Sequence, residues 1–190
     1  MSSGPDDPEL RQALRARLGR LGAPLQIVAE GVLGEDDQRI DWVAVEPGGR
    51  VCVVLVGGPE DGEALLARGL AQRAWVQARL GDWQQLAPGL AARADLRPRL
   101  LLVAADFSRV TRRAAQEADA EGVGLARFRW VPADEGRALD LALEPLGARS
   151  AAPDAAPAAR GPAAPLTSVF RSGLDERDFG GNGGGSPTIC

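Results

Sequence analysis

The chain has 190 residues with a formal net charge of −4, which is long enough for one domain and an appendage. It contains no His, no Lys and no Tyr, so all 22 basic residues are Arg. These absences exclude a Ser-His-Asp or Cys-His catalytic arrangement, a phosphate-binding loop with its Lys, and a Lys Schiff base. Because Arg stays protonated, any catalysis would depend on Asp, Glu, Cys, a bound metal or a cofactor.

The first half of the chain predicts a helix followed by three strands. Leu10, Leu14 and Leu18 lie four residues apart and predict a helix over residues 8–20. Residues 25–33 and 39–45 predict two strands, and a Pro-Gly-Gly turn separates the second from a third strand over residues 51–56. The third run is almost wholly β-branched, which is typical of a central strand buried on both faces. The three strands together predict an antiparallel meander.

The second half predicts alternating helices and strands. A long helix is expected over residues 60–80, with acidic residues leading it, followed by a strand over residues 100–104. A helix over residues 108–120, capped by Ser108, precedes a last strand over residues 123–131. Residues 134–143 predict a short helix. The fold class expected is therefore α/β, a central mixed sheet flanked by helices.

The composition changes at about residue 148, so we expect three parts: a domain over 1–147, an Ala/Pro-rich linker over 148–165, and a flexible tail over 166–190. The tail regains some apolar residues, which could dock in the groove of a protein partner and become ordered on binding. Packing of this segment on its own domain is the alternative. The candidate partner-binding residues are Leu166, Val169, Phe170, Leu174 and Phe179.

The hydropathy of the chain, its N-terminal residues and its cysteines lead us to expect an intracellular protein. No apolar run approaches the roughly 20 residues that a membrane span needs, and the polar, acidic N-terminus is unlike a signal peptide. We therefore expect a cytoplasmic protein that does not engage a membrane. Cys52 lies inside an apolar run and Cys190 is the last residue, so neither a disulfide nor a zinc site is expected.

Three segments carry a resemblance to a known family. The hairpin sequence Arg39-Ile-Asp-Trp-Val-Ala-Val-Glu-Pro-Gly-Gly-Arg-Val-Cys-Val-Val-Leu-Val resembles the hairpin of the PD-(D/E)xK, or restriction-endonuclease-like, nucleases. The helix with Gln72 and Trp75 and the segment Arg99-Leu-Leu-Leu-Val-Ala-Ala-Asp-Phe-Ser are also similar to members of that family. The element order helix, three strands, helix, strand, helix, strand fits as well. The resemblance covers roughly residues 9–131 and implies a restriction-endonuclease-like core.

The resemblance also implies where metal chemistry would reside. In the family, two carboxylates on the hairpin strands hold Mg²⁺, which activates water, and a Lys neutralises charge. Asp41 matches the first carboxylate, and Glu9 is a plausible match for a further acid on the first helix. Counting along the hairpin places the second carboxylate at Leu55 and the Lys at Gly57, so both are lost. We therefore expect vestigial positions, no metal cofactor and no efficient cleavage.

An alternative keeps the nuclease active through relocated acids. Glu60, Asp61 and Glu63 follow the third strand and could turn a carboxylate inward, with Asp41 as the remaining metal ligand and Mg²⁺ as the cofactor. Acidic residues are also simply favoured at a helix N-terminus. Glu46 follows Asp41 across the turn and is expected to lie away from it.

Nucleic-acid binding is a further open possibility. Through Gly147 the domain carries 18 Arg against 22 acidic residues, 18 − 22 = −4, so DNA binding would need a local cluster of arginines. The candidates are Arg97, Arg99, Arg109, Arg112 and Arg113. The sequence thus predicts an inactive nuclease-like module that binds a protein, with nucleic acid as a second ligand; the alternative is a metal-dependent endonuclease.

Overall fold

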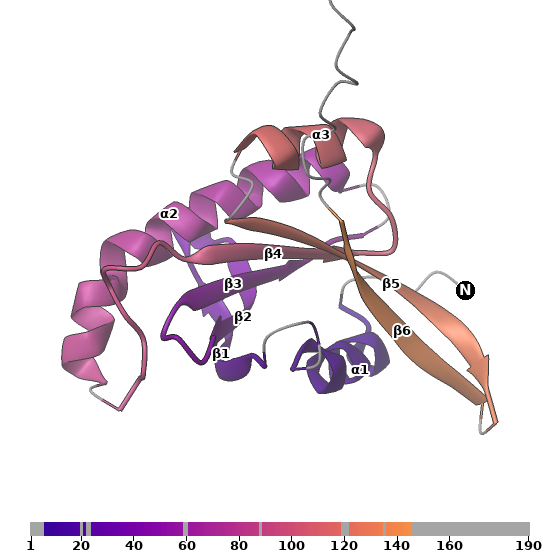
Figure 1. Cartoon of the computed structure of the whole chain (residues 1–190), viewed down its shortest axis with the longest axis horizontal. Coiled ribbons are helices and arrows are strands. Elements are labelled where there is room, and N and C mark those ends of the chain that lie inside the picture. Colours follow the sequence, from indigo (N-terminus) through magenta and orange to yellow (C-terminus); the bar gives the residue numbers. More distant parts are fainter. Residues whose placement is uncertain are drawn as a thin grey trace, which may run out of the picture. The chain divides into compact units, whose positions relative to one another are not determined.

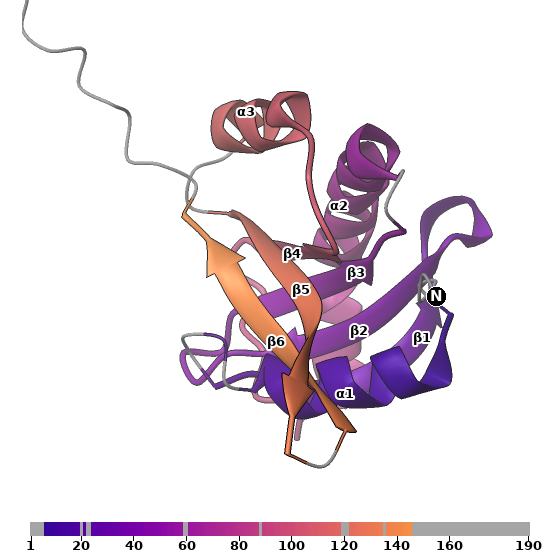
Figure 2. The same ribbon diagram turned by 90° about the vertical axis from the view of Figure 1, so that its right-hand side faces the viewer.

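The computed structural model describes residues 6–19, 21, 24–58, 61–87, 89–118, 122–134 and 136–145. All of them belong to one compact unit, Met1–Ala151. One six-stranded sheet forms the middle layer. Helix α1 covers one face of this sheet, and α2 and α3 cover the other (Figures 1 and 2). The elements, in chain order, are α1 (Pro8–Leu18), β1 (Gln26–Leu33), the short 3₁₀ turn η1 (Glu35–Asp37), β2 (Arg39–Val45), β3 (Val51–Val56), α2 (Gly62–Leu86), β4 (Arg99–Ala104), α3 (Arg109–Ala118), β5 (Val123–Ala133) and β6 (Gly136–Glu144).

The strands lie in the sheet in the same order as in the chain, from β1 to β6. The first three form an antiparallel meander, in which Trp42 pairs with Val54. Strands β3, β4 and β5 run parallel to one another, because α2 and α3 each return the chain to the end of the sheet at which the preceding strand began. Strand β6 pairs antiparallel with β5. The predicted α/β class, mixed sheet and meander are therefore confirmed.

Two apolar clusters, one on each face of the sheet, hold these layers together. On one face, the four-residue spacing of Leu10, Leu14 and Leu18 turns one side of α1 onto the sheet, and all three are buried. All six residues of β3 are buried as well, since both of its faces are covered. That confirms the prediction of a strand in the centre of the sheet. On the other face, α2 contributes buried residues such as Leu65 and Val76.

The helix ends follow local rules. The carboxylate of Asp7 accepts the backbone N–H of Glu9 at 2.9 Å and caps α1. The Ser108 hydroxyl accepts the N–H of Thr111 at 3.0 Å, which confirms the predicted cap of α3. Helix α2 continues to Leu86, six residues beyond the predicted end. Nothing in residues 81–86 forces an earlier stop.

The predicted short helix over residues 134–143 is wrong, because residues 136–144 form β6. In this segment Leu139, Leu141 and Leu143 alternate with other residues at a period of two, which suits a strand. Gly136, with φ at 101°, completes the tight reversal from β5. Strand β5 is correspondingly longer than predicted and is not the last strand.

The predicted linker and tail, residues 148–190, lie outside the described residues, and so do all five candidate partner-binding residues. None of the helices in the described part of the chain combines the length and the hydropathy of a membrane-spanning segment. Cys52 is a free, buried thiol, as expected for a residue in an apolar strand.

Candidate functional site

The carboxylate of Asp41 is the centre of the candidate site, and both of its oxygens have partners. Arg11 Nη1 donates to Oδ1 at 2.5 Å, and the backbone N–H of Val56 donates to Oδ2 at 2.7 Å. Asp41 is only 7 % exposed. It lies on β2, the second strand of six, so it is not a polar residue left at the edge of the sheet. Its charge is neutralised inside the protein by an arginine that the sequence did not single out.

Arg11 reaches Asp41 from α1, on the face of the sheet that this helix covers. Its position directly after the buried Leu10 places the side chain at the border of the apolar face of α1. The guanidinium lies 4.9 Å from the centre of the Trp42 ring, a cation–π distance, and the side chain is 16 % exposed. A fixed cation therefore lies against the carboxylate that the nuclease resemblance assigns to a metal ion.

The two neighbouring positions of the expected metal site are apolar and tightly packed. Leu55 follows Val54, the partner of Trp42, and so lies on the strand next to Asp41. Its side chain is fully buried in the cluster beneath α2. A Cβ atom at Gly57 would come within 2.5 Å of Leu65 Cδ2, so a longer side chain fits there only if Leu65 moves. The positions expected for a Glu and a Lys are thus occupied or closed by leucines.

Glu9 has a structural partner on β6. Arg137 donates to it through Nε at 3.1 Å and through Nη2 at 2.5 Å, and the Glu9 side chain is 57 % exposed. Arg137 also stacks on Trp130 at 4.3 Å. This pair links α1 to the β5–β6 hairpin at the surface. Exposure on this scale makes its contribution to stability small.

The three acids considered as relocated metal ligands do not share one role. Glu60 lies outside the described residues, and Glu63 is exposed in the first turn of α2, as expected for an acidic residue at a helix N-terminus. Asp61 turns back towards the end of β3, where its Oδ2 accepts the N–H of Gly58 at 2.7 Å. Across the described ranges, no group of three or more acidic, Cys or His side chains is arranged to hold a metal ion.

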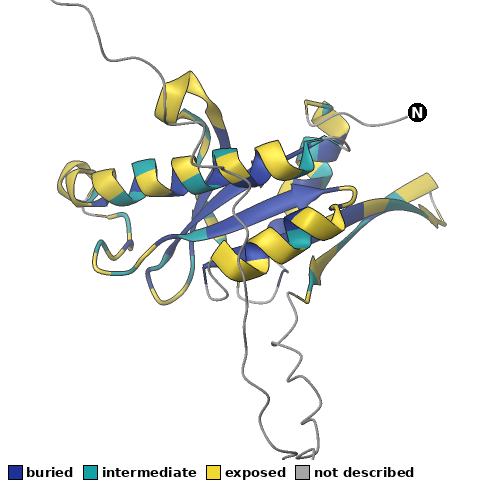
Figure 3. Ribbon diagram, turned by 90° about the horizontal axis from the view of Figure 1, so that it is seen from above, coloured by how far each residue is buried: buried dark blue, intermediate teal, exposed yellow. Residues whose placement is uncertain are grey.

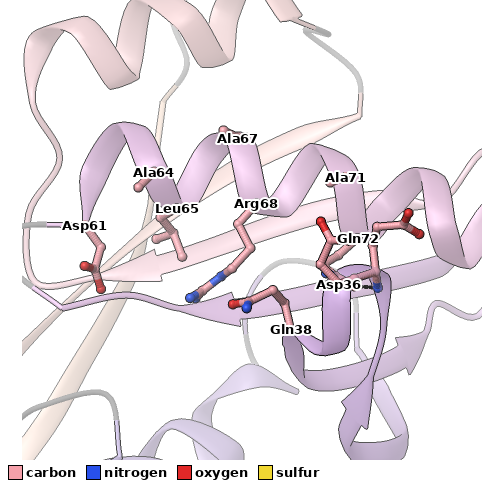
Figure 4. A pocket seen from close by; sticks show the side chains of 10 residues that line it. Asp36, Gln38, Asp61, Ala64, Leu65, Ala67, Arg68, Ala71 and Gln72 are labelled. Atoms are coloured by element: carbon pink, nitrogen blue, oxygen red, sulfur yellow. Dashed lines mark hydrogen bonds between the residues drawn. The ribbon is translucent and has the colours of Figure 1, made fainter.

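A groove of about 510 Å³ lies between the start of α2 and the turn that joins β1 to β2 (Figure 4). Asp61 and Arg68, from the start of α2, and Gln38, from the turn between β1 and β2, point into it. Arg68 Nη2 also donates to the carbonyl of Val56 at 3.4 Å, near the site of Asp41. Acidic and basic side chains both line the groove. It is lined by Glu35, Asp36, Gln38, Asp61, Ala64, Leu65, Ala67, Arg68, Ala71 and Gln72.

Gln72 fixes the turn on the far side of this groove. Its amide accepts the N–H of Glu35 and donates to the carbonyl of the same residue, each at 3.0 Å. A Cβ atom at Gly34 would come within 1.8 Å of Gln72 Oε1, so only glycine permits this approach. Asp36 and Asp37 both adopt positive φ angles, 52° and 55°. The clamp by Gln72 holds this unusual backbone in place.

Two of the five candidate nucleic-acid-binding arginines have acidic partners among the described residues. Arg99 pairs with Glu46 at 3.2 Å, at the end of the hairpin away from Asp41. Arg112 binds Glu144 at 2.6 Å and also Asp106, and these hydrogen bonds, Glu144 first, raise the pKa of the Arg112 guanidinium.

The other three candidates are exposed. Arg97 lines a second groove beside α2. Arg109 and Arg113 lie one turn apart on α3, and neither forms an ion pair with another described residue. The candidates therefore do not form one basic patch, and Arg109 and Arg113 are the two exposed candidates that share a helix.

Two contacts at the candidate site were not predicted from the sequence. Arg11 gave no signal, because its role depends on α1 lying across β2. Gln72 did have a signal, since it is a polar residue at helical spacing within the buried side of α2, between Gly69 and Val76. A polar side chain at such a position must find hydrogen-bond partners inside the protein.

Comparison with known proteins finds no matching family model, no matching curated protein and no matching solved structure.

Proposed function

We propose that this chain is a catalytically inactive module on a restriction-endonuclease-like core, which acts in the cytoplasm by binding a protein and, secondarily, nucleic acid. The order of elements from α1 to β5, with the meander followed by two parallel strands, supports the nuclease-like core. The hairpin residues 39–56 and the order of elements carry this assignment.

One observation carries the proposal of inactivity: the carboxylate of Asp41 is bound by Arg11 and by the N–H of Val56. Mg²⁺ in a nuclease needs several oxygen ligands held together, usually with water completing its octahedron. Here the adjacent positions are Leu55 and Gly57, which supply no side-chain oxygen. A divalent cation at Asp41 would have to displace the guanidinium and would find one carboxylate there.

The competing proposal, a metal-dependent endonuclease, is favoured by the position of Asp61. Its carboxylate accepts the N–H of Gly58, so an acidic side chain reaches the end of β3 from a position that the family pattern does not use. In that case Mg²⁺ would be the cofactor. Asp61 and Asp41 would have to act together, with Glu63 or Glu60 as a further acid.

A plasmid-cleavage assay separates these two proposals. Full-length protein is incubated with supercoiled plasmid in Mg²⁺ or Mn²⁺, beside Asp41→Asn and Asp61→Asn variants. Asp41→Asn is preferred to Ala because the amide oxygen still accepts the N–H of Val56. We expect no nicking by any of the three proteins. Nicking by the natural sequence that either substitution abolishes would refute the inactive assignment.

Nucleic-acid binding, if present, should depend on α3. Arg109 and Arg113 are exposed there, and their charges are available to phosphate oxygens. We expect weak duplex binding that falls steeply with salt and is lost in the Arg109→Gln/Arg113→Gln double variant. Arg129→Gln is the control, because Arg129 is equally exposed but pairs with Asp140 at 2.8 Å. Binding that is insensitive to salt would refute a phosphate-directed role.

The protein partner is proposed to bind the tail, through Leu166, Val169, Phe170, Leu174 and Phe179. A pull-down should compare the full chain with a chain that ends at Gly147. The full chain should recover a partner that the shorter chain loses, and the Val169→Ala/Phe170→Ala variant should lose it as well. Equal recovery by all three would refute docking through the tail.

A further inference from the structure

The guanidinium of Arg68 carries a positive charge that the described part of the chain does not neutralise. Its hydrogen bond there runs from Nη2 to the carbonyl of Val56 at 3.4 Å, which is long for such a bond. Its Nε is buried and has no hydrogen-bond partner among the described residues. None of the ion pairs between described residues includes Arg68. A half-buried guanidinium of this kind is stabilised by an anionic oxygen placed beside it.

The carboxylate of Asp61 is an opposite charge in the same groove. Asp61 and Arg68 are separated by about two helical turns, so both lie on the face of α2 that lines the groove. Figure 4 shows the Arg68 guanidinium reaching back along the helix to a place between Asp61 and Gln38. Asp61 accepts the N–H of Gly58 through Oδ2, and no described arginine pairs with it. These two opposite charges share a groove without binding each other, which leaves a place for a ligand that binds both. Figure 3 shows that α2 turns an exposed side to solvent along its length.

The other residues of the groove restrict the charge and the size of that ligand. The volume of about 510 Å³ lies within the range of small-molecule pockets. Glu35 and Asp36 add two more carboxylates, and Asp36 lies at the opposite end of the groove from Asp61 (Figure 4). A simple anion would be repelled by three acidic side chains, and a simple cation would be repelled by Arg68. The ligand that fits therefore carries both charges, with a surplus of positive charge favoured.

We propose that this groove binds a free α-amino acid and prefers one with a basic side chain. The α-carboxylate of the ligand binds the guanidinium of Arg68, and the Gln38 amide is a further donor to it. The α-ammonium group binds the carboxylate of Asp61. Both groups are attached to one carbon atom of the ligand, so a single small molecule joins the two side chains. A cationic side chain of the ligand then extends along the alanines of α2 towards Asp36.

This groove is separate from the site at Asp41. Arg11 reaches Asp41 from α1, whereas the groove lies beside α2, which covers the other face of the sheet. The two sites share a contact with the backbone of Val56, whose N–H binds Asp41 and whose carbonyl accepts from Arg68. Amino-acid binding in the groove requires no metal ion and no nucleic acid. It therefore does not depend on the function proposed above.

Isothermal titration calorimetry of the full chain tests the class of ligand, at low ionic strength where charge pairs are least screened. The titrants are L-arginine, L-leucine, L-glutamate and agmatine, which is arginine without its carboxylate. We expect a dissociation constant of roughly 1 mM for arginine and about tenfold weaker binding of leucine. Glutamate should not bind, because it adds a negative charge to an acidic groove. Agmatine should bind at least about tenfold more weakly than arginine, because it leaves Arg68 without an anionic partner.

Two variants test where the amino acid binds, with circular dichroism to establish that each is folded. Arg68→Met should weaken arginine binding by about tenfold or more and leave agmatine binding unchanged. Asp61→Asn should weaken the binding of both, although its amide oxygen still accepts the N–H of Gly58. Arg79→Met is the matched control, because Arg79 lies on the same helix but stacks on Trp75 at 4.1 Å, outside the groove.

Three results would overturn the proposal. The first is no binding of arginine at concentrations up to about 20 mM. The second is equal binding of arginine and agmatine, or tighter binding of glutamate than of arginine. The third is arginine binding that is indifferent to Arg68→Met. The comparison of arginine with agmatine uses the natural sequence, so it decides the question even where a variant fails to fold.

Discussion

The ion pair between Arg11 and Asp41 makes a quantitative prediction about stability. The two side chains are 16 % and 10 % exposed, so the Arg11→Met variant leaves a largely buried carboxylate without its counterion. Breaking a buried pair in this way costs about 3–5 kcal/mol. Asp41 keeps the N–H of Val56 and slight contact with water, which places the expected loss near the lower end, about 3 kcal/mol. Methionine preserves the packing of the side-chain stem on Trp42.

Urea denaturation of four proteins measures this loss as a double-mutant cycle: the natural sequence, Arg11→Met, Asp41→Asn and the double variant. The double variant should be less destabilised than the sum of the single variants by about 2 kcal/mol. Arg15→Met on the same helix is the control, because the Arg15–Glu30 pair is 60 % and 40 % exposed and should be worth only about 0.5 kcal/mol. Additive single variants, or equal losses for Arg11→Met and Arg15→Met, would refute the proposed internal neutralisation of Asp41.

Two further predictions concern the clamp and the buried thiol. Gln72→Ala should cost about 2 kcal/mol and speed hydrogen exchange at the Glu35 amide, because both amide hydrogen bonds are lost; unchanged exchange would contradict the clamp. Burial raises the pKa of the Cys52 thiol from 9.0 to about 12. At pH 8 the folded protein should therefore hold about 1,000-fold less Cys52 thiolate than the unfolded chain. In a Cys190→Ser background, the folded protein should react correspondingly slowly with Ellman's reagent. Because the folded pKa lies above the unfolded one, stability from this thiol should be present below pH 9 and fall as the pH rises from about 9 towards 12. Rapid labelling of the folded protein would contradict the burial.

The meander could be predicted closely from the sequence because its signals are local. The Pro-Gly-Gly turn and the β-branched run give β2 and β3 their observed bounds, Arg39–Val45 and Val51–Val56. Strand β6 was missed although Leu139, Leu141 and Leu143 alternate, because short segments rich in Ala and Leu suit helix and strand alike. The partner strand decided the outcome, since β5 offers a free edge directly before the turn at Gly136.

The candidate site was only partly predictable for a different reason. Counting across the hairpin places Leu55 on β3, the strand that pairs with the strand of Asp41, because strand register follows from the turn. The side chain of Leu55 packs in the cluster beneath α2, whereas Arg11 reaches Asp41 from α1. The contact of Arg11 with Asp41 spans 30 residues, and that of Gln72 with Glu35 spans 37. Contacts at such separations depend on how helices cross the sheet, which no local pattern specifies.

We propose that Arg11 takes the place of a metal ion at Asp41, and direct Mn²⁺ binding tests this proposal. The electron paramagnetic resonance signal of free Mn²⁺ is followed during titration into the full-length protein and into Asp41→Asn. We expect the same concentration of free Mn²⁺ with both proteins, and no saturable site. One equivalent of bound Mn²⁺ that disappears in Asp41→Asn would contradict it.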